Sequence, residues 1–354
     1  MDENGKVYHL YSDIRRMEDE LLRLAPDDEQ EIKRLIRIVT KLQNFEVPVE
    51  KPDDMMNIWD KFKRMASFIP LGKYLQFGMK QSVADYVKRF RSPVAQELLS
   101  SVVPDVLAAT ALFFTLAYRT KGDGGWPLGG SLRFAQRMQQ RFEELGGRLF
   151  LSSKVEKFIV ENGKATGIKL QSEKDIRPFD YIIPAIDIHA LLHGLLEGKY
   201  PVPYYAQRFA DPEKYPISSC TLVAIGVETA LGDRPHNLIF HPSTTITVSG
   251  VEQASLMLNH YAYDPAFCPG GRTLVEFIIS DFGYDRWDAL RNESEQAYQS
   301  EKKRIEDLLL SELQRAYPET AGKAQVIDVA TPLTFNRYCN AYRGAYMSFL
   351  STAG

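Results

Sequence analysis

The sequence predicts an α+β fold, in which a mixed β-sheet is covered by a helical layer and a further helix and β-meander occupy the middle of the chain. Three observations lead to this class. Helix-like apolar periodicity dominates the N-terminal third, short branched apolar runs fill the middle, and strand-like runs share the last third with one long helix. The 354 residues, 44% of them hydrophobic and 25% charged, can bury more than one core.

The N-terminal third is expected to begin with a strand and to continue as helices. Val7 to Tyr11 follow an Asn-Gly turn and predict a short strand that joins the main sheet. Ser12 and Asp27 are candidate caps of two helices, each with one apolar face and one charged face. We therefore expect both helices to cover a core and to face solvent on the other side.

A segment rich in Met and aromatic residues extends from Met55 to Phe90, with lysines interleaved. This composition suits a membrane-touching face whose lysines lie near lipid headgroups. It equally suits a helical layer packed on a sheet. We favour the packed layer, because amphipathic surface helices are the common case.

The next predicted helix runs from Pro104 to Tyr118 and is apolar nearly all round. Such a helix is buried on more than one face. One face could form the wall of a long apolar substrate cavity, and Phe113, Phe114 and Tyr118 are the candidate residues. Packing in a core is the alternative, which we favour for each residue, because large apolar side chains mostly serve packing.

The middle of the chain contains a glycine-rich turn from Gly122 to Ser131, then a helix that Gly146-Gly147 ends. Asn162-Gly163 is a strong signal for a β-hairpin. Short apolar runs around it predict a meander of strands over Leu149–Leu151, Val155–Val160, Thr166–Leu170 and Tyr181–Ile183.

The last third is expected to form the main sheet and its long helix. The helix is predicted from Asp288 to Ala316. Strand-like runs cover Cys220–Glu228, Ala254–Tyr261, Thr273–Ile279 and Ala324–Ala330. Their separation exceeds hairpin length, so we expect a mixed sheet.

Composition and spacing exclude several classes of function. A net charge of -3 gives no electrostatic basis for binding nucleic acid. The three cysteines are far apart, and the His189/His193 pair lacks further ligands, so we expect no metal. The polar N-terminus and the absence of a long apolar run predict a cytoplasmic protein, with peripheral membrane contact as the further option.

A family resemblance is carried by Pro127-Leu128-Gly129-Gly130-Ser131, by Gly163-Lys164-Ala165-Thr166-Gly167-Ile168 and by Asp180-Tyr181-Ile182-Ile183. Near the end, Thr331-Pro332-Leu333-Thr334 and Gly344-Ala345 add to it. In order and spacing the chain resembles the phytoene dehydrogenase-like FAD oxidoreductases of the amine-oxidase-like group. The helix and meander then resemble a remnant of their doubly wound FAD-binding domain.

The resemblance implies a domain plan. Residues 1–125 and 200–335 would form the two parts of a substrate domain, 126–199 the remnant of the FAD-binding domain, and 336–354 the lead-in to a C-terminal flavin segment. The 23 glycines contain no Gly-x-Gly-x-x-Gly, the turn that holds the FAD pyrophosphate in this family. We therefore expect the middle portion of a larger flavoenzyme, with FAD bound in the full-length parent and left free by this chain alone.

The resemblance also implies site residues. Val155 would hold the FAD adenine through its backbone, with Gly129 and Gly130 at the cofactor. Thr331, Phe335 and Tyr338 would lie beside the flavin and its substrate, with core packing as the alternative. No residue type or spacing identifies a catalytic acid, base or nucleophile, so the catalytic residues stay unassigned.

The function implied by the resemblance is flavin hydride transfer or isomerisation on a long apolar substrate, such as a polyene, isoprenoid or lipid. The alternative is a non-catalytic module that binds an apolar ligand or another protein. If the strand at Tyr181–Ile183 lacks a neighbour, its exposed edge would favour self-association of the chain through residues 148–185.

Overall fold

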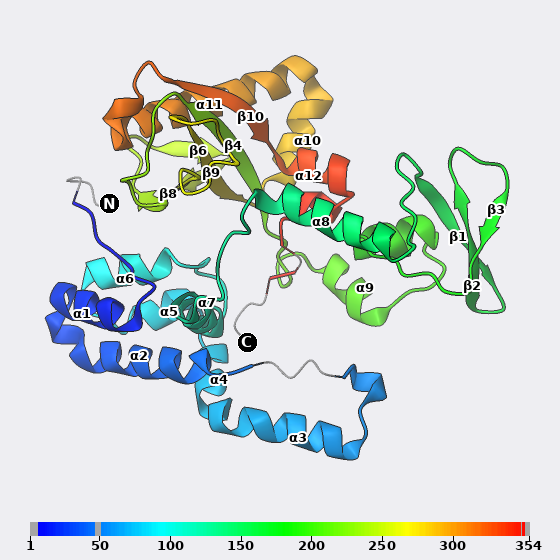
Figure 1. Ribbon diagram of the computed structural model, residues 1–354, viewed down its shortest axis with the longest axis horizontal. Coiled ribbons are helices and arrows are strands. Elements are labelled where there is room, and N and C mark those ends of the chain that lie inside the picture. Colours follow the sequence, from blue (N-terminus) through cyan, green and yellow to red (C-terminus); the bar gives the residue numbers. More distant parts are fainter. Residues whose placement is uncertain (1–5, 47–50, 348, 351–354) are drawn as a thin grey trace. The chain divides into compact units, whose positions relative to one another are not determined.

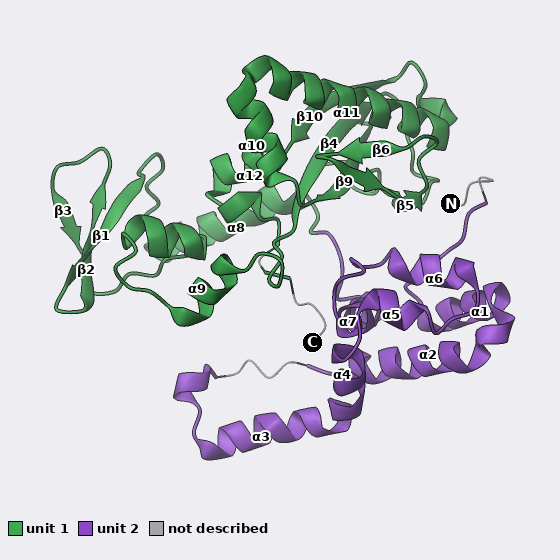
Figure 2. Cartoon of the chain, turned by 180° about the vertical axis from the view of Figure 1, so that it is seen from behind, with its two compact units in different colours: residues 1–3, 127–350 green, residues 4–126, 351–354 purple. Residues whose placement is uncertain are grey.

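The computed structural model describes residues 6–46, 51–347 and 349–350. These residues form two compact units that meet along the chain at Trp126–Pro127 (Figure 2). We call the part before this point the helical unit and the part after it the sheet unit. None of the helices in these described ranges has the length and apolar content needed to cross a bilayer.

The helical unit consists of short helices (Figure 1). The α-helices are α1 (Ile14–Leu24), α2 (Glu29–Gln43), α3 (Ile58–Phe68), α4 (Gly72–Met79), α5 (Val83–Val87), α6 (Pro93–Ser100) and α7 (Ala109–Lys121). The 3-10 helices are η1 (Pro26–Asp28), η2 (Asp53–Met55) and η3 (Ile69–Leu71).

The start of this unit differs from the prediction. Val7 to Tyr11 form no strand and do not join a sheet. Asp13, one residue after the predicted cap, begins α1, because its carboxylate accepts a hydrogen bond from the Arg16 amide at 2.9 Å. The Asp28 carboxylate accepts from the amides of Arg91 and Ser92 at 2.8 and 2.9 Å and so links η1 to the start of α6.

The core of the helical unit is aromatic and centres on α7. Phe113 is fully buried, and its ring lies 4.9 Å from the Tyr86 ring and 6.3 Å from the Phe77 ring. Gly78 of α4 allows close packing, because a Cβ there would contact the Thr110 backbone and side chain below normal distances. α7 begins five residues after Pro104, the predicted start. The helix therefore forms over the residues that are buried in the core.

The sheet unit contains both α-helices and strands. The α-helices are α8 (Gly130–Glu144), α9 (Pro203–Ala210), α10 (Tyr284–Glu293), α11 (Glu295–Ala316) and α12 (Pro332–Cys339). The strands are β1 (Val155–Glu161), β2 (Lys164–Leu170), β3 (Ile176–Pro178), β4 (Ser219–Val227), β5 (Asn237–Phe240), β6 (Ile246–Val248), β7 (Val251–Gln253), β8 (Leu256–His260), β9 (Thr273–Asp281) and β10 (Ala324–Ala330). Single turns are η4 (Ala190–Leu195, a π-helix), η5 (Pro318–Thr320) and η6 (Tyr342–Gly344).

The main sheet has five strands in the order β10-β4-β9-β8-β5. All of its pairs are antiparallel, so the predicted mixed sheet is wrong while the α+β class is confirmed. Long connections do not require parallel pairing here, because the excursion 228–272 returns through β5 and β8 to the same sheet edge. β6 and β7 form a separate two-stranded ribbon.

One face of this sheet carries the core of the unit. Along β4 and β9, fully buried residues alternate with half-buried ones, and Val223, Ile225 and Phe277 point to the buried side. Ile305, Leu309 and Leu313 of α11 pack on that side. The predicted long helix is divided into α10 and α11 at Ser294, whose extended backbone and side chain cap α11.

β1, β2 and β3 form a separate antiparallel meander. The predicted hairpin at Asn162-Gly163 is confirmed, and both residues have positive φ, 53° and 77°. Leu149–Leu151 and Tyr181–Ile183 are not strands, and Ile176–Pro178 is the third strand instead. The helix predicted after the glycine-rich turn forms as α8, but its apolar side chains are exposed: Leu132 and Met138 keep 70% and 62% of their surface.

Candidate functional site

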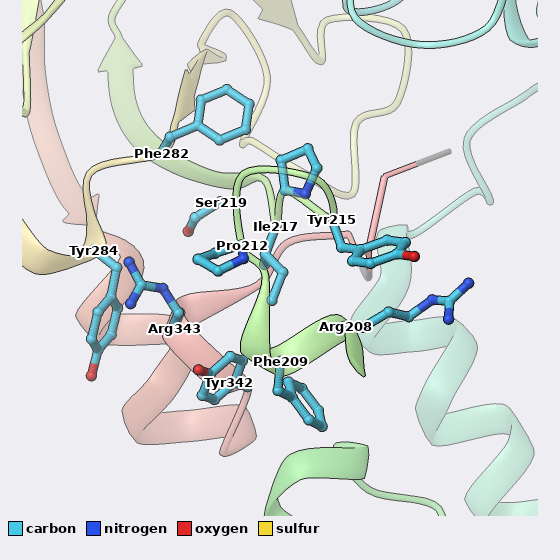
Figure 3. A pocket seen from close by; sticks show the side chains of 11 residues that line it. Arg208, Phe209, Pro212, Tyr215, Ile217, Ser219, Phe282, Tyr284, Tyr342 and Arg343 are labelled. Atoms are coloured by element: carbon cyan, nitrogen blue, oxygen red, sulfur yellow. The ribbon is translucent and has the colours of Figure 1, made fainter. Parts of the chain in front are cut away.

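Two neighbouring cavities lie in the sheet unit and share Tyr284, Tyr342 and Arg343. The larger, of about 750 Å³, is lined by the start of β1, by Gln171, by η4 and by the end of α12. The smaller, of about 300 Å³, lies between α9, the start of β4 and the Tyr342 turn (Figure 3). Volumes of this order suit small ligands or parts of a cofactor.

The turn Tyr342–Gly344 between the cavities has an unusual backbone. Arg343 has a φ of 52° and Gly344 a φ of 63°. A side chain at Gly344 would collide with the carbonyl of Pro332, so glycine is required there. Positive φ at a non-glycine residue such as Arg343 persists only where the surroundings enforce it, and such positions concentrate at functional sites.

Asp187 ties this turn to η4. One carboxylate oxygen accepts hydrogen bonds from the His189 and Ala190 amides at 2.8 and 3.1 Å, as a carboxylate does at the start of a helix. The other oxygen accepts from the Tyr342 amide at 3.1 Å, across 155 residues of chain. The helix that follows is a π-helix, a form found frequently at functional sites.

An aromatic cluster fills the space beside the turn. The His189 ring stacks on the Tyr342 ring at 4.1 Å and lies 4.5 Å from the His193 ring. The Phe209 ring meets His189 edge-on at 5.0 Å. Burial, and the neighbouring His193, lower the pKa of His189, although Asp187 acts in the opposite direction. His189 is therefore neutral at pH 7 and able to donate or accept a hydrogen bond in the larger cavity.

Two arginines line the smaller cavity. Arg343 donates to the Asp285 carboxylate at 2.5 Å and lies 5.8 Å from the Tyr284 ring. The Arg208 guanidinium lies between two aromatic rings, 3.5 Å from that of Tyr204 and 4.7 Å from that of Tyr215. The charge of Arg343 is compensated by Asp285, so the cavity is aromatic with the Arg208 guanidinium as its cation, which suits an anionic or delocalised group.

Comparisons with known proteins identify relatives. The chain is 28% identical to a 4,4'-diapophytoene desaturase (4,4'-diapolycopene-forming) and 25% identical to a 4,4'-diapolycopene oxygenase, both from Methylomonas sp, over 67% and 68% of its length. It is 20% identical over 97% of its length to an all-trans-retinol 13,14-reductase from Danio rerio. No family model matches. The chain is related to the phytoene dehydrogenase-like FAD oxidoreductases, as its sequence predicts.

The chain spans 47% and 48% of the two Methylomonas proteins and 61% of the Danio rerio protein. A crystal structure of an oxidoreductase from Methanosarcina mazei has a similar fold, with a TM-score of 0.51 at 17% identity. This similarity covers 78% of the chain and 61% of that protein.

The residues predicted to hold the cofactor of these phytoene dehydrogenase-like proteins lie in different places. Val155 lines the larger cavity at the start of β1, an edge strand of its sheet. The Gly129 amide donates to Asp264 at 2.6 Å and the Gly130 amide donates to Pro127 at 2.9 Å. Both glycine amides thus have protein acceptors, and neither glycine lines a cavity described above.

The residues predicted to contact substrate are divided between the two units. Phe113, Phe114 and Tyr118 belong to α7 of the helical unit, where Phe113 serves as core. Thr331 is buried, bonds to the Tyr298 hydroxyl at 2.8 Å and caps α12. Phe335 is half-buried.

Tyr338 is the sixth predicted substrate residue, and 74% of its surface is exposed. α12 reaches the larger cavity through Asn336 and Asn340 instead. Thr331, Phe335 and Tyr338 line neither of the two cavities. Helix periodicity alone does not say which face of α12 a cavity will meet.

Tyr284, Tyr342 and Arg343 line both cavities and were not predicted from the sequence. The sequence feature that points to these residues is Gly344, which belongs to the family resemblance. Its requirement for glycine fixes the turn that carries Tyr342 and Arg343.

Metal-binding residues do not gather in the described ranges: no group of three or more His, Cys, Asp or Glu is placed to hold an ion. Cys220 is buried, and burial raises the pKa of its thiol to about 12. Cys268 is half-buried with a raised pKa, and Cys339, at the end of α12, is exposed.

Proposed function

We propose that the chain is the substrate-binding middle region of an FAD-dependent oxidoreductase that acts on a long apolar substrate, such as a polyene, isoprenoid or lipid. The observation that carries this proposal is the similarity to the two Methylomonas carotenoid enzymes over two thirds of the chain. Bound FAD would supply hydride transfer or isomerisation. The chain's own residues would bind and orient the cofactor and the substrate and exclude water.

The larger cavity is the part of the sheet unit that fits such a cofactor. Its lining contains many polar side chains, with Lys154, Gln171, His189, Asn336 and Arg343 among them. Val155 lines it on the edge strand β1, whose free edge can offer backbone groups to the edge of an adenine. A polar nucleotide suits this lining better than a polyene does.

A visible absorption spectrum of the purified chain, before and after addition of FAD, tests the proposal. We expect a colourless chain that leaves most FAD free in gel filtration, because the sequence contains no Gly-x-Gly-x-x-Gly turn for the pyrophosphate. We expect adenosine diphosphate to bind weakly at Val155, seen as changes in amide resonances of β1 and η4. Unchanged resonances there would contradict the adenine assignment, and tightly bound FAD would contradict the expectation for the isolated chain.

We further propose that the protein is cytoplasmic and that α3 makes a peripheral contact with membranes. α3 contains no buried residue, and Ile58, Trp59 and Phe62 keep 59–84% of their surface. From the sequence we favoured a helical layer packed on a sheet for this segment, but α3 buries none of its residues. Exposed aromatic and aliphatic side chains next to Lys61 and Lys63 are typical of a helix that lies in a lipid interface.

The alternative function is a non-catalytic module that binds an apolar ligand or another protein. The exposed apolar face of α8 favours an interaction, because soluble monomers rarely expose large apolar patches. Retention of a polyene without any flavin-dependent turnover, even with the remaining parts of the enzyme supplied, would favour this alternative.

A further inference from the structure

One row of side chains on the second face of the five-stranded sheet carries polar groups on three neighbouring strands, β9, β8 and β5. Residues directly opposite each other on neighbouring strands share a face. Ala224, Glu276, Asn259 and Asn237 are opposite one another across β4, β9, β8 and β5. The parallel row beside them is apolar and contains Leu222, Ile278, Met257 and Ile239. A carboxylate in the centre of such a face is unusual and invites a functional explanation.

The two ends of this polar row are satisfied by protein groups. The Tyr261 hydroxyl donates to Oε2 of Glu276 at 2.7 Å. Burial and the nearby Glu276 carboxylate raise the pKa of Tyr261, so the phenol stays protonated and donates. Asn237 donates from Nδ2 to Oδ1 of Asn259 at 2.7 Å. Both bonds hold the central side chains in place.

The centre of the row is left open. Within the described residues, Oε1 of Glu276 accepts no hydrogen bond, Nδ2 of Asn259 donates none, and Glu276 has no ion pair. Among the described residues, the hydroxyl of Tyr86 is the side-chain polar atom that is fully buried and has no hydrogen-bond partner. Oε1 of Glu276 and Nδ2 of Asn259 are therefore not fully buried. One free acceptor and one free donor therefore lie on neighbouring strands, at directly opposed positions.

An aromatic residue, Tyr346, lies near Glu276. The Tyr346 ring is close enough to Glu276 and Cys220 for their charges to contribute to its raised pKa, after burial as the main cause. Phe335, predicted to contact substrate, lies 6.4 Å from Tyr346. An apolar ligand on this face would thus meet aliphatic side chains, the Tyr346 ring and one donor–acceptor pair.

We propose that Glu276 and Asn259 form a hydroxyl-recognition site, so that the preferred ligand is an apolar chain carrying an alcohol group rather than a pure hydrocarbon. The ligand hydroxyl donates to Oε1 of Glu276 and accepts from Nδ2 of Asn259. A hydrocarbon leaves the carboxylate desolvated without a partner, which disfavours it. The inference rests on the proposed apolar substrate and names its chemical class.

A pair of fluorescent polyenes tests the site in the full chain: all-trans-retinol and the hydrocarbon that lacks only its hydroxyl group. We expect the chain to bind the alcohol about tenfold more tightly, since a hydrogen bond to a charged group has roughly that effect. Glu276→Gln should reduce the preference by about threefold or more, and Glu276→Leu should abolish it. Tyr261→Phe should keep it, because Glu276 remains.

The matched control is Glu252→Gln, the same chemical change on β7 at an exposed carboxylate, which should keep the full preference. Circular dichroism verifies that each variant is folded. Equal affinity of the unmodified chain for both polyenes would overturn the hydroxyl site and leave the proposed function intact. If folded Glu276→Leu still prefers the alcohol as strongly as the unmodified chain does, the hydroxyl site is likewise overturned and the proposed function is left intact. Binding of neither polyene would overturn both the hydroxyl site and the apolar substrate.

Discussion

Gly344 is the residue at which backbone conformation and packing both demand glycine. Its φ is 63°, and an added Cβ would strike the Pro332 carbonyl. We expect Gly344→Ala to lower the free energy of unfolding by roughly 2–4 kcal/mol, because strain and overpacking add. Urea denaturation measures the loss. Gly322, with a φ of 70° and open space around it, is the control, and alanine there should cost only about 1 kcal/mol. Equal losses would contradict the steric explanation.

His260 makes stability depend on pH. Its Nε2–H donates to the Arg234 carbonyl at 3.0 Å, and its Nδ1 accepts from the Ala262 amide at 3.3 Å, so both nitrogens are used in the neutral form. Burial lowers the pKa of His260, and His236 lowers it further. The unfolded chain therefore binds the proton more readily, and stability is lost as the pH falls below about 6.5.

Thermal melting at pH 7.5 and at pH 5.5 checks this. We expect the melting temperature to fall toward the lower pH, and His260→Gln to reduce the fall. His189, whose pKa is also lowered, contributes with the same sign and remains in the variant. A melting temperature that rises on acidification would contradict the assignment.

At the scale of elements, substitutions on α3 should change membrane binding without changing the stability of the fold. Because α3 buries no residue, we expect Trp59→Ser together with Phe62→Ser to leave the melting temperature within about 2 °C. The same change should reduce co-sedimentation with anionic phospholipid vesicles several-fold. Ile327→Ser, which removes an apolar residue 64% exposed on β10, is the control and should bind as before. If the unmodified chain does not co-sediment with the vesicles, the proposed membrane contact of α3 is wrong.

Elements were predictable where a local signal and burial agree. The Asn162-Gly163 hairpin, β10 and the buried part of α7 follow from turn chemistry and apolar periodicity. The strands predicted at Val7–Tyr11 and Tyr181–Ile183 do not form, because branched and aromatic residues favour a strand only where a neighbouring strand supplies hydrogen bonds. The split of the long helix at Ser294 was missed, since a serine inside a helical pattern is also tolerated on a helix surface.

At the scale of the whole molecule, we expect the chain to self-associate. α8 exposes Phe134, Met138 and Phe142, and Tyr181 and Ile183 keep 90% and 88% of their surface without forming the predicted strand. Burial of these side chains between two copies would remove apolar surface from water. Light scattering at micromolar concentration should give a mass above 40.3 kDa. Met138→Glu with Phe142→Glu should restore the monomer, whereas Ile327→Glu should not.

The candidate site was predictable only in part, because it is assembled from distant segments. Of the residues that the family resemblance implies, Val155 lines the larger cavity, whereas Thr331, Phe335 and Tyr338 line neither cavity. Tyr342, Arg343 and Tyr284 meet only after β4, α10 and η6 have packed, and no local pattern marks them. The polar row at Glu276 needs the register of four strands, which a sequence with long connections does not fix.

The different exposure of the three cysteines gives the protein a built-in labelling position. A maleimide dye at neutral pH should react first with Cys339, because the Cys220 thiol is buried and the Cys268 thiol is half-buried with a raised pKa. Cys339 precedes Asn340, which lines the larger cavity. An environment-sensitive dye on Cys339 would therefore report, by a shift in emission, when a nucleotide enters that cavity.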